Sequence, residues 1–178
     1  DKVQGGTVID LGAGTGIVSY AFTRAGARKV YALEPDPSEI VGQGAIRRLG
    51  YGDTIQIISA FGEAIPLQNA SVDVVYCRQV LHHTQDLPQV MRECYRVLKP
   101  GGVLLACREH VVNNAEQLRQ FLNVHPVHQL AGGENAYTLK QYKGAILTAG
   151  FKLVHVYAQF DSVINAFPEM TADEVNNL

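Results

Sequence analysis

The sequence predicts an α/β fold with a doubly wound, mostly parallel sheet and helices on both faces. Apolar, β-branched runs of strand length alternate with amphipathic stretches of helix length from residue 7 onward. The first run breaks into a turn with three alternating glycines, and the second ends at an acid, Glu34. A chain of 178 residues with 47% hydrophobic residues is long enough for a single domain with a sizeable core.

The predicted elements follow one another in order. The first strand starts at residue 7 and runs into the glycine turn, and further strands are expected at residues 29–33, 54–59, 72–77, 103–107 and 151–160. Apolar residues at helical spacing predict helices at residues 17–25, about 38–49, 87–98, 115–122 and 138–149. Glycines at positions 26, 50 and 150 mark helix ends.

Residues 113–137 interrupt this alternation with a helical piece and a segment rich in His, Pro and Gly. An excursion of this length above a parallel sheet is typical of a lid that covers a substrate, with a plain surface loop as the alternative. The end of the chain, Thr171-Ala172-Asp173-Glu174, has the form of a capping box. We therefore expect residues 1–178 to be one domain from a longer chain, with the last strand or strands of the sheet missing.

Composition narrows the possible partners. A formal net charge of -2 without a basic cluster disfavours nucleic acid. No apolar run reaches the length of a membrane span, so no membrane association is expected. The three cysteines lack a metal-type spacing and no signal-peptide pattern precedes the first strand, which favours a cytoplasmic protein. The sequence carries no indication of oligomeric state.

The glycine turn Gly12-Ala13-Gly14-Thr15-Gly16 predicts close backbone contact with a ligand, because glycine takes positive φ without a Cβ in the way. A dinucleotide turn carries its third glycine one position later, where this chain has Ile17. The spacing therefore favours a ligand without a diphosphate. Glu34 offers two acceptor oxygens for vicinal ribose hydroxyls. An NAD-type oxidoreductase and a non-catalytic cofactor-binding module remain the alternatives.

Further motifs give these features a family context. The chain resembles class I S-adenosylmethionine-dependent methyltransferases, of the small-molecule group that includes ubiquinone and menaquinone methyltransferases. The resemblance rests on residues 8–16, Glu34, residues 62–67, 71–75, 81–83 and 92–102. It implies a Rossmann-like fold, S-adenosylmethionine as cofactor, and transfer of a methyl group by in-line displacement. The acceptor would be a small molecule with an oxygen, nitrogen or carbon nucleophile.

The resemblance also assigns cofactor contacts. The glycine turn would wrap the methionine moiety, Glu34 would bind the ribose, residues 61–64 would line the adenine, and the residues after the fourth strand would face the methyl group. Glu63 stands where Asp is commoner, so a backbone contact to the adenine is favoured over a side-chain contact. The expected cofactor-binding residues are Asp10, Gly12, Ala13, Gly14, Gly16, Glu34, Pro35, Phe61, Gly62, Glu63, Ala64, Arg78 and Gln79.

An oxygen or nitrogen nucleophile can need a base, and imidazole titrates near neutrality. The candidates for this catalytic role are His82, His83 and His110, followed by His125 and His128. Glu109, Glu134 and Tyr137 are further possible pocket groups. His125 and His128 with Glu134 and His110 have side chains that suit zinc. Pro126 argues against a shared helical face for that His pair, and the family chemistry needs no metal, so no metal is expected.

Overall fold

A five-stranded parallel sheet forms the centre of the computed structural model, which describes residues 2–131, 133–158, 161–165 and 170–177. The strand order is β3-β2-β1-β4-β5, and each neighbouring pair is parallel. The strands are β1 (Thr7–Leu11), β2 (Lys29–Leu33), β3 (Ile55–Ile58), β4 (Val72–Arg78) and β5 (Leu98–Cys107). This order confirms the predicted doubly wound fold.

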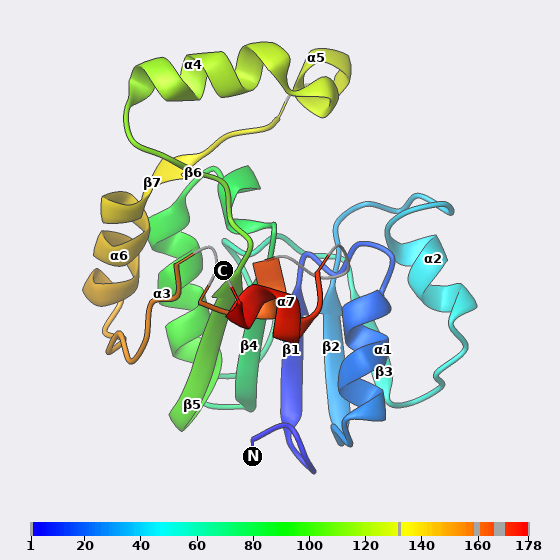
Figure 1. Cartoon of the computed structure of the whole chain (residues 1–178). Helices are drawn as coiled ribbons and strands as arrows, with labels where there is room; N and C mark the ends of the chain where they lie inside the picture. Colours follow the sequence, from blue (N-terminus) through cyan, green and yellow to red (C-terminus); the bar gives the residue numbers. More distant parts are fainter. Residues whose placement is uncertain (1, 132, 159–160, 166–169, 178) are drawn as a thin grey trace.

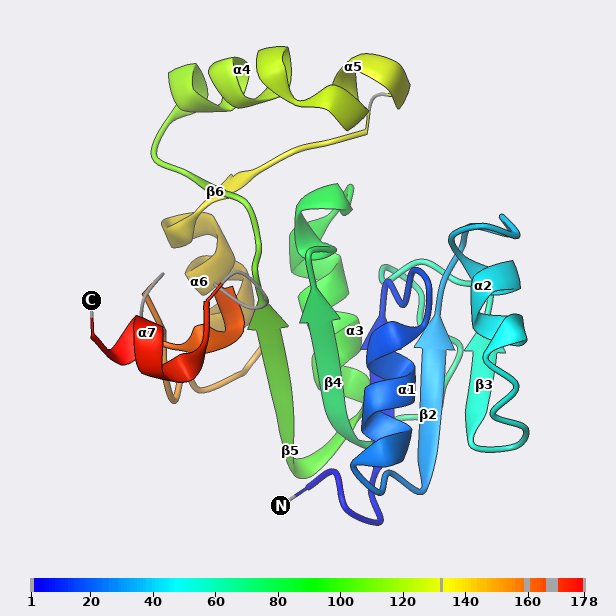
Figure 2. The same ribbon diagram turned by 45° about the vertical axis from the view of Figure 1, so that its right-hand side comes forward.

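Helices cover both faces of the sheet, with α1 and α7 on one side and α3 and α6 on the other (Figures 1 and 2). The apolar stripe of α3 packs Val90 and Met91 against the sheet, in a core with Ile9 and Val75. The helices are α1 (Ile17–Arg24), α2 (Gln43–Arg48), α3 (Leu87–Val97), α4 (Ala115–Val124), α5 (Pro126–Ala131), α6 (Leu139–Thr148) and α7 (Ala172–Asn176), with 3-10 turns η1 (Leu81–His83) and η2 (Val163–Asn165). Among the described residues, these helices are too short or too polar to cross a membrane.

The start of the second predicted helix moves along the chain. Helix α2 begins at Gln43 and not near residue 38, because Gly42 has φ 85° and ψ -155°, a conformation outside the helical region. Asp36 instead accepts the backbone N–H of Ser38 at 2.8 Å and forms a turn before the helix. The expected capping box is present at the start of α7, where Thr171 and Glu174 cap each other's backbone.

The predicted sixth strand at residues 151–160 is wrong for its described part, residues 151–158, which form no strand. A strand needs a neighbour for its backbone hydrogen bonds, and within the described residues β5 pairs with β4 alone. The alternating apolar side chains are left in solvent, and Val154 is 93% exposed. Residues 159–160 lie outside the described residues.

Residues 113–131 and 133–137 form a helical arm above the carboxyl ends of the strands (Figures 1 and 2). The arm leaves and returns through a two-stranded parallel ladder of β6 (Val111–Val112) and β7 (Tyr137–Thr138). Asn114 caps α4 by accepting the N–H of Gln117 at 2.9 Å. The sequence did not predict α5, which begins at Pro126, a residue that is well tolerated in the first turn of a helix.

Candidate active site

The loops after β1, β2 and β4 meet at the carboxyl edge of the sheet, where the strand order reverses between β1 and β4. Ligands of doubly wound folds bind at this position. The glycine turn follows β1 and needs positive φ at Gly12 (67°), Gly14 (54°) and Gly16 (80°). The backbone N–H groups of Gly12 and Ala13 both donate to the carbonyl of Leu33, at 2.9 and 3.0 Å. The end of β2 therefore fixes the turn.

Glu34, at the tip of β2, closes the same turn with its side chain. Its Oε2 accepts the N–H of Gly14 at 2.7 Å and its Oε1 accepts the N–H of Asp36 at 2.9 Å. The residue is buried, and Gln43 donates to its backbone carbonyl at 2.8 Å. Each carboxylate oxygen keeps a second acceptor position for a ligand hydroxyl. The sequence pointed to the ligand role of Glu34 but missed this backbone role, and it missed Gln43.

Asp10 lies under the glycine turn on β1 and is 2% exposed. Its Oδ2 accepts the hydroxyl of Ser19 at 2.6 Å, a partner that the sequence did not reveal. Burial raises the pKa of Asp10 to about 6, and the nearby carboxylate of Glu34 adds to this rise, whereas Ser19 and Arg78 oppose it. A buried acid close to neutrality is costly for the empty fold and is a feature of functional sites.

The stretch expected at the adenine, residues 61–64, forms a turn in which the Ala64 N–H donates to the Phe61 carbonyl at 3.2 Å. The ring of Phe61 is 68% exposed, and Gly62 is buried against Val90. Glu63 uses its Oε1 to accept the N–H of Gln85 at 3.0 Å before α3. The side chain of Glu63 thus already has a protein partner, which agrees with the preference for a backbone contact at this position.

The segment after β4 links the glycine turn to the histidines. Gln79 has φ 53°, uncommon for a residue with a side chain, and its N–H donates to the Cys107 carbonyl at 3.1 Å. The next residue, Val80, packs so closely on the turn that a Cβ on Gly12 would lie 2.4 Å from its Cγ2. Arg78 is the last residue of β4 and Pro35 follows Glu34 at the end of β2, so both lie at the same edge.

The structure brings the three candidate catalytic histidines together. The rings of His82 and His83 have centroids 4.1 Å apart, and those of His82 and His110 have centroids 4.3 Å apart. His82 is 2% exposed and its Nδ1 lies 2.7 Å from Oε2 of Glu109. That carboxylate also accepts the backbone N–H groups of Val80 and His82, at 3.1 and 3.2 Å. Burial lowers the pKa of His110, and neighbouring His82 lowers it further.

The helical arm and α6 hold this cluster in place. Tyr137 donates from its hydroxyl to the Thr84 carbonyl at 2.8 Å, and Tyr142 donates to the His110 carbonyl at 3.1 Å. Phe121 of α4 packs against both His110 and His125, with ring centroids at 4.8 and 4.9 Å, and the two histidine rings are 5.8 Å apart. Glu134 and His125 thereby join the cluster from segments far along the chain.

The cysteines are free thiols, and Cys77 and Cys94 are buried. The hydrogen bond with Cys94 and burial raise the pKa of the Cys77 thiol well above its usual range. A thiolate nucleophile is therefore disfavoured there.

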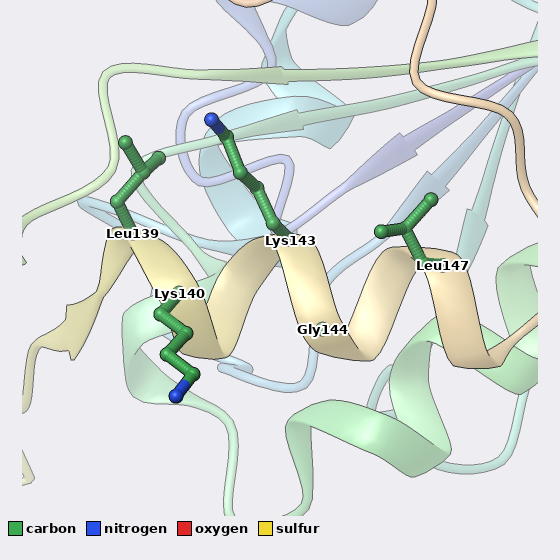
Figure 3. A pocket seen from close by; sticks show the side chains of 5 residues that line it. All are labelled: Leu139, Lys140, Lys143, Gly144 and Leu147. Carbon is green, nitrogen blue, oxygen red and sulfur yellow. The ribbon is translucent and has the colours of Figure 1, made fainter.

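A shallow hollow on α6 lies apart from the residues described above. Leu139, Lys143 and Leu147 project from one side of the helix beside Lys140 (Figure 3). Its lining, which Gly144 completes, contains no acid, histidine or nucleophile. We therefore assign the candidate site to the carboxyl edge of the sheet and not to this hollow.

Comparison with known proteins identifies methyltransferases as relatives of this chain. A family model described as "Methyltransferase domain" matches residues 9–106. The ubiquinone/menaquinone biosynthesis C-methyltransferase UbiE of Hahella chejuensis is 36% identical over 104 residues, which is 57% of this chain and 42% of that protein. Dimethylglycine N-methyltransferase of Parasynechococcus marenigrum is 37% identical over 103 residues, 56% of this chain and 36% of that protein. The chain thus spans about two fifths of these relatives.

Among solved structures, an S-adenosylmethionine-dependent methyltransferase from Mesorhizobium loti superposes with a TM-score of 0.75 and 23% identity, over 97% of this chain and 87% of that chain. The crystal structure of a "putative sarcosine dimethylglycine methyltransferase" from Galdieria sulphuraria also superposes with a TM-score of 0.75, with 19% identity over 99% of this chain and 70% of that chain. At these identities the likeness shows the fold. The matched residues 9–106 contain the glycine turn, Glu34 and the His82–His83 pair, and end before His110.

Proposed function

This chain belongs to the methyltransferase domain family, and from that premise we propose that it transfers the methyl group of S-adenosylmethionine to a small-molecule acceptor. One observation carries the proposal. The carboxylate of Glu34 and the positive-φ glycine turn are joined by the 2.7 Å hydrogen bond from Gly14, so an acid and a glycine backbone lie side by side at the ligand edge of the sheet.

The residues present fit such a cofactor. A Cβ on Gly14 would meet nothing within 4 Å, so the turn leaves free space beside its backbone. We propose that the turn holds the methionine end of the cofactor, that Glu34 accepts ribose hydroxyls with its remaining lone pairs, and that residues 61–64 border the adenine. The bound cofactor supplies a methyl group already activated by its sulfonium. Asp10 beneath the turn would gain a cation nearby, which favours its ionised form.

The chain's own contribution to the transfer is alignment and proton removal. A rigid turn and a braced histidine cluster suit an in-line displacement, in which orientation supplies most of the acceleration. We propose that His82, His83 or His110 takes the proton of an oxygen or nitrogen acceptor. The names of the two curated relatives, a C-methyltransferase and a dimethylglycine N-methyltransferase, support a small-molecule acceptor. The helical arm over the strand ends would cover it as a lid.

Calorimetry with S-adenosylmethionine and S-adenosylhomocysteine tests this proposal. We expect one site per chain for both ligands, and no heat with NADH because Ile17 occupies the position of the third dinucleotide glycine. Glu34→Ala should weaken binding by roughly 30-fold or more, since charged hydrogen bonds are lost.

The matched control is Glu39→Ala in the same loop. Glu39 forms exposed ion pairs with Arg47 and Arg48, which contribute little, so the affinity should stay within about twofold. Absence of heat with both sulfur ligands, or equal losses in the two variants, would contradict the proposal.

A further inference from the structure

We propose that Glu134, His82 and His83 bind one divalent transition-metal ion, with the His110–His125 pair supplying the remaining nitrogen ligand. Two groups of potential ligands share Glu134: His82 with His83, and His110 with His125. Within each group the ligand atoms all lie within 4.8 Å of one another. The binding of an ion does not depend on the proposed methyl transfer.

One oxygen of the Glu134 carboxylate is buried without a hydrogen-bond donor among the described residues. The side chain is 7% exposed, and among the described residues its Oε2 has no hydrogen-bond partner. The nearest nitrogens, His82 Nε2 and His83 Nδ1, lie at 3.7 and 3.8 Å, beyond hydrogen-bond distance. A buried carboxylate oxygen without a partner is costly, so the position calls for a cation.

His82 lies between two carboxylates, with Nε2 3.7 Å from Oε2 of Glu134. Its Nδ1 lies 2.7 Å from Oε2 of Glu109, and an ionised carboxylate can only accept, so Nδ1 carries the hydrogen. In the neutral ring Nε2 is then an acceptor that faces another acceptor, Glu134 Oε2. A carboxylate that orients an imidazole through its other nitrogen is the usual outer partner of a histidine metal ligand. The pair Glu109–His82 has this arrangement.

The spacing suits a metal ion better than direct contact between the side chains. Ligands bound at about 2.0–2.1 Å in a tetrahedral site lie roughly 3.4 Å apart. The distances of 3.7 and 3.8 Å around Glu134 are a few tenths of an ångström longer, so small side-chain shifts complete the site. His125 adds a buried Nδ1 that also lacks a hydrogen-bond partner among the described residues. Imidazole and carboxylate ligands suit zinc and its first-row neighbours.

The proposed ion would lie where it can contact the methyl acceptor. Val80 packs on the glycine turn, and His82 lies two residues after it in the chain. The ion would therefore lie beside the cofactor turn and under the helical arm. There it can hold an oxygen or nitrogen of the acceptor as a fifth ligand and lower the pKa of that group. This last step rests on the proposed function, in which the ion would replace His82 and His83 as the group that activates the acceptor, and it predicts an acceptor that can coordinate a metal.

Metal titration of the full chain tests the site. After treatment with a chelator, the protein is titrated with Zn²⁺ by calorimetry and with Co²⁺ by visible absorption. We expect one ion per chain and Co²⁺ bands characteristic of nitrogen and oxygen ligands at low coordination number. Glu134→Gln and His83→Ala should each weaken binding by roughly 100-fold, because a direct ligand contributes at least as much as an outer partner.

Two matched variants serve as controls. Glu116→Gln changes an exposed acid of the same arm, and His155→Ala removes an exposed histidine outside the cluster. Both should bind as the unmodified chain does. Absence of stoichiometric binding, or equal losses in test and control variants, would overturn the proposal. Calorimetry with S-adenosylhomocysteine on each variant reports a folded cofactor turn, so loss of metal alone is distinguished from misfolding and from failure of the proposed function.

Discussion

The glycine turn and the histidine–glutamate cluster lie next to each other but are built in different ways. The turn is held by backbone hydrogen bonds between neighbouring strand ends, such as those from Gly12 and Ala13 to Leu33. The cluster is built from side chains of η1, the segment after β5 and the helical arm, and among the described residues it keeps buried polar atoms without partners, Glu134 Oε2 among them. The turn is thus satisfied within the protein, whereas the cluster leaves a buried acceptor that the proposed cation would satisfy.

Gly12→Ala should have the largest effect on stability. At φ 67° a Cβ is strained, and it would lie 2.4 Å from Val80 Cγ2. Left-handed strain and overpacking together should lower the free energy of unfolding by about 2–4 kcal/mol. Urea denaturation measures this change.

Gly14→Ala is the matched variant, because its Cβ would meet nothing within 4 Å at φ 54°. Backbone strain alone should lower its free energy of unfolding by about 1–2 kcal/mol. The variant should nevertheless lose cofactor binding, because the Cβ enters the space proposed for the ligand. Equal destabilisation by the two alanines would show that Val80 does not limit the turn.

Asp10→Asn should stabilise the cofactor-free protein. Burial raises the pKa of Asp10 from 3.8 to about 6 in the folded state. As the pH rises from about 4 to 6, the unfolded chain therefore loses this proton before the folded protein does, and the free energy of unfolding falls. Asparagine does not ionise, so the variant avoids this loss, and its free energy of unfolding at pH 7.5 should be about 2–3 kcal/mol higher than that of the unmodified chain.

Near pH 4 the gain should disappear, since Asp10 is then protonated when folded. Denaturation at the two pH values measures the difference, and Asp53→Asn, an exposed carboxyl, is the control. The same gain at both pH values would show that the buried charge is not its cause.

Glu109→Gln tests the cluster, and its effect on stability should be as small as that of Gly14→Ala. In the unmodified chain the two Glu109 oxygens accept from the Val80 N–H and contact His82 Nδ1. The amide nitrogen of glutamine would have to replace one of these oxygens, and a nitrogen that donates cannot accept a hydrogen bond. One unsatisfied contact should cost about 1–2 kcal/mol. Thermal or urea unfolding measures it, with Glu116→Gln expected within about 0.5 kcal/mol of the unmodified chain as an exposed control. A neutral Glu109→Gln would mean that Glu109 does not fix His82.

Sequence patterns predicted the turn region well because its determinants are local. Positive φ needs glycine at Gly12, Gly14 and Gly16, and an acid at the end of the second strand is visible at Glu34. The partners Ser19 and Gln43 were missed, since a serine or glutamine in a helix has no distinctive spacing. The strand at residues 151–158 was predicted wrongly. The alternation of apolar and polar residues indicates which side chains could be buried, but it does not show whether a neighbouring strand is present to pair with.

The sequence by itself determined the parallel sheet, the glycine turn and the family, because hydrophobic periodicity and glycine backbone preferences act over a few residues. Tertiary structure alone decided that His82, Glu109, His110, His125 and Glu134 meet. Their proximity depends on how the arm folds back over the strand ends, through contacts such as Tyr137 to Thr84, which join residues 53 positions apart. No local pattern encodes such a contact. The sequence grouped His125 and His128 with Glu134 and His110 only as side chains that suit zinc, whereas the structure joins His82 and His83 to Glu134, His110 and His125.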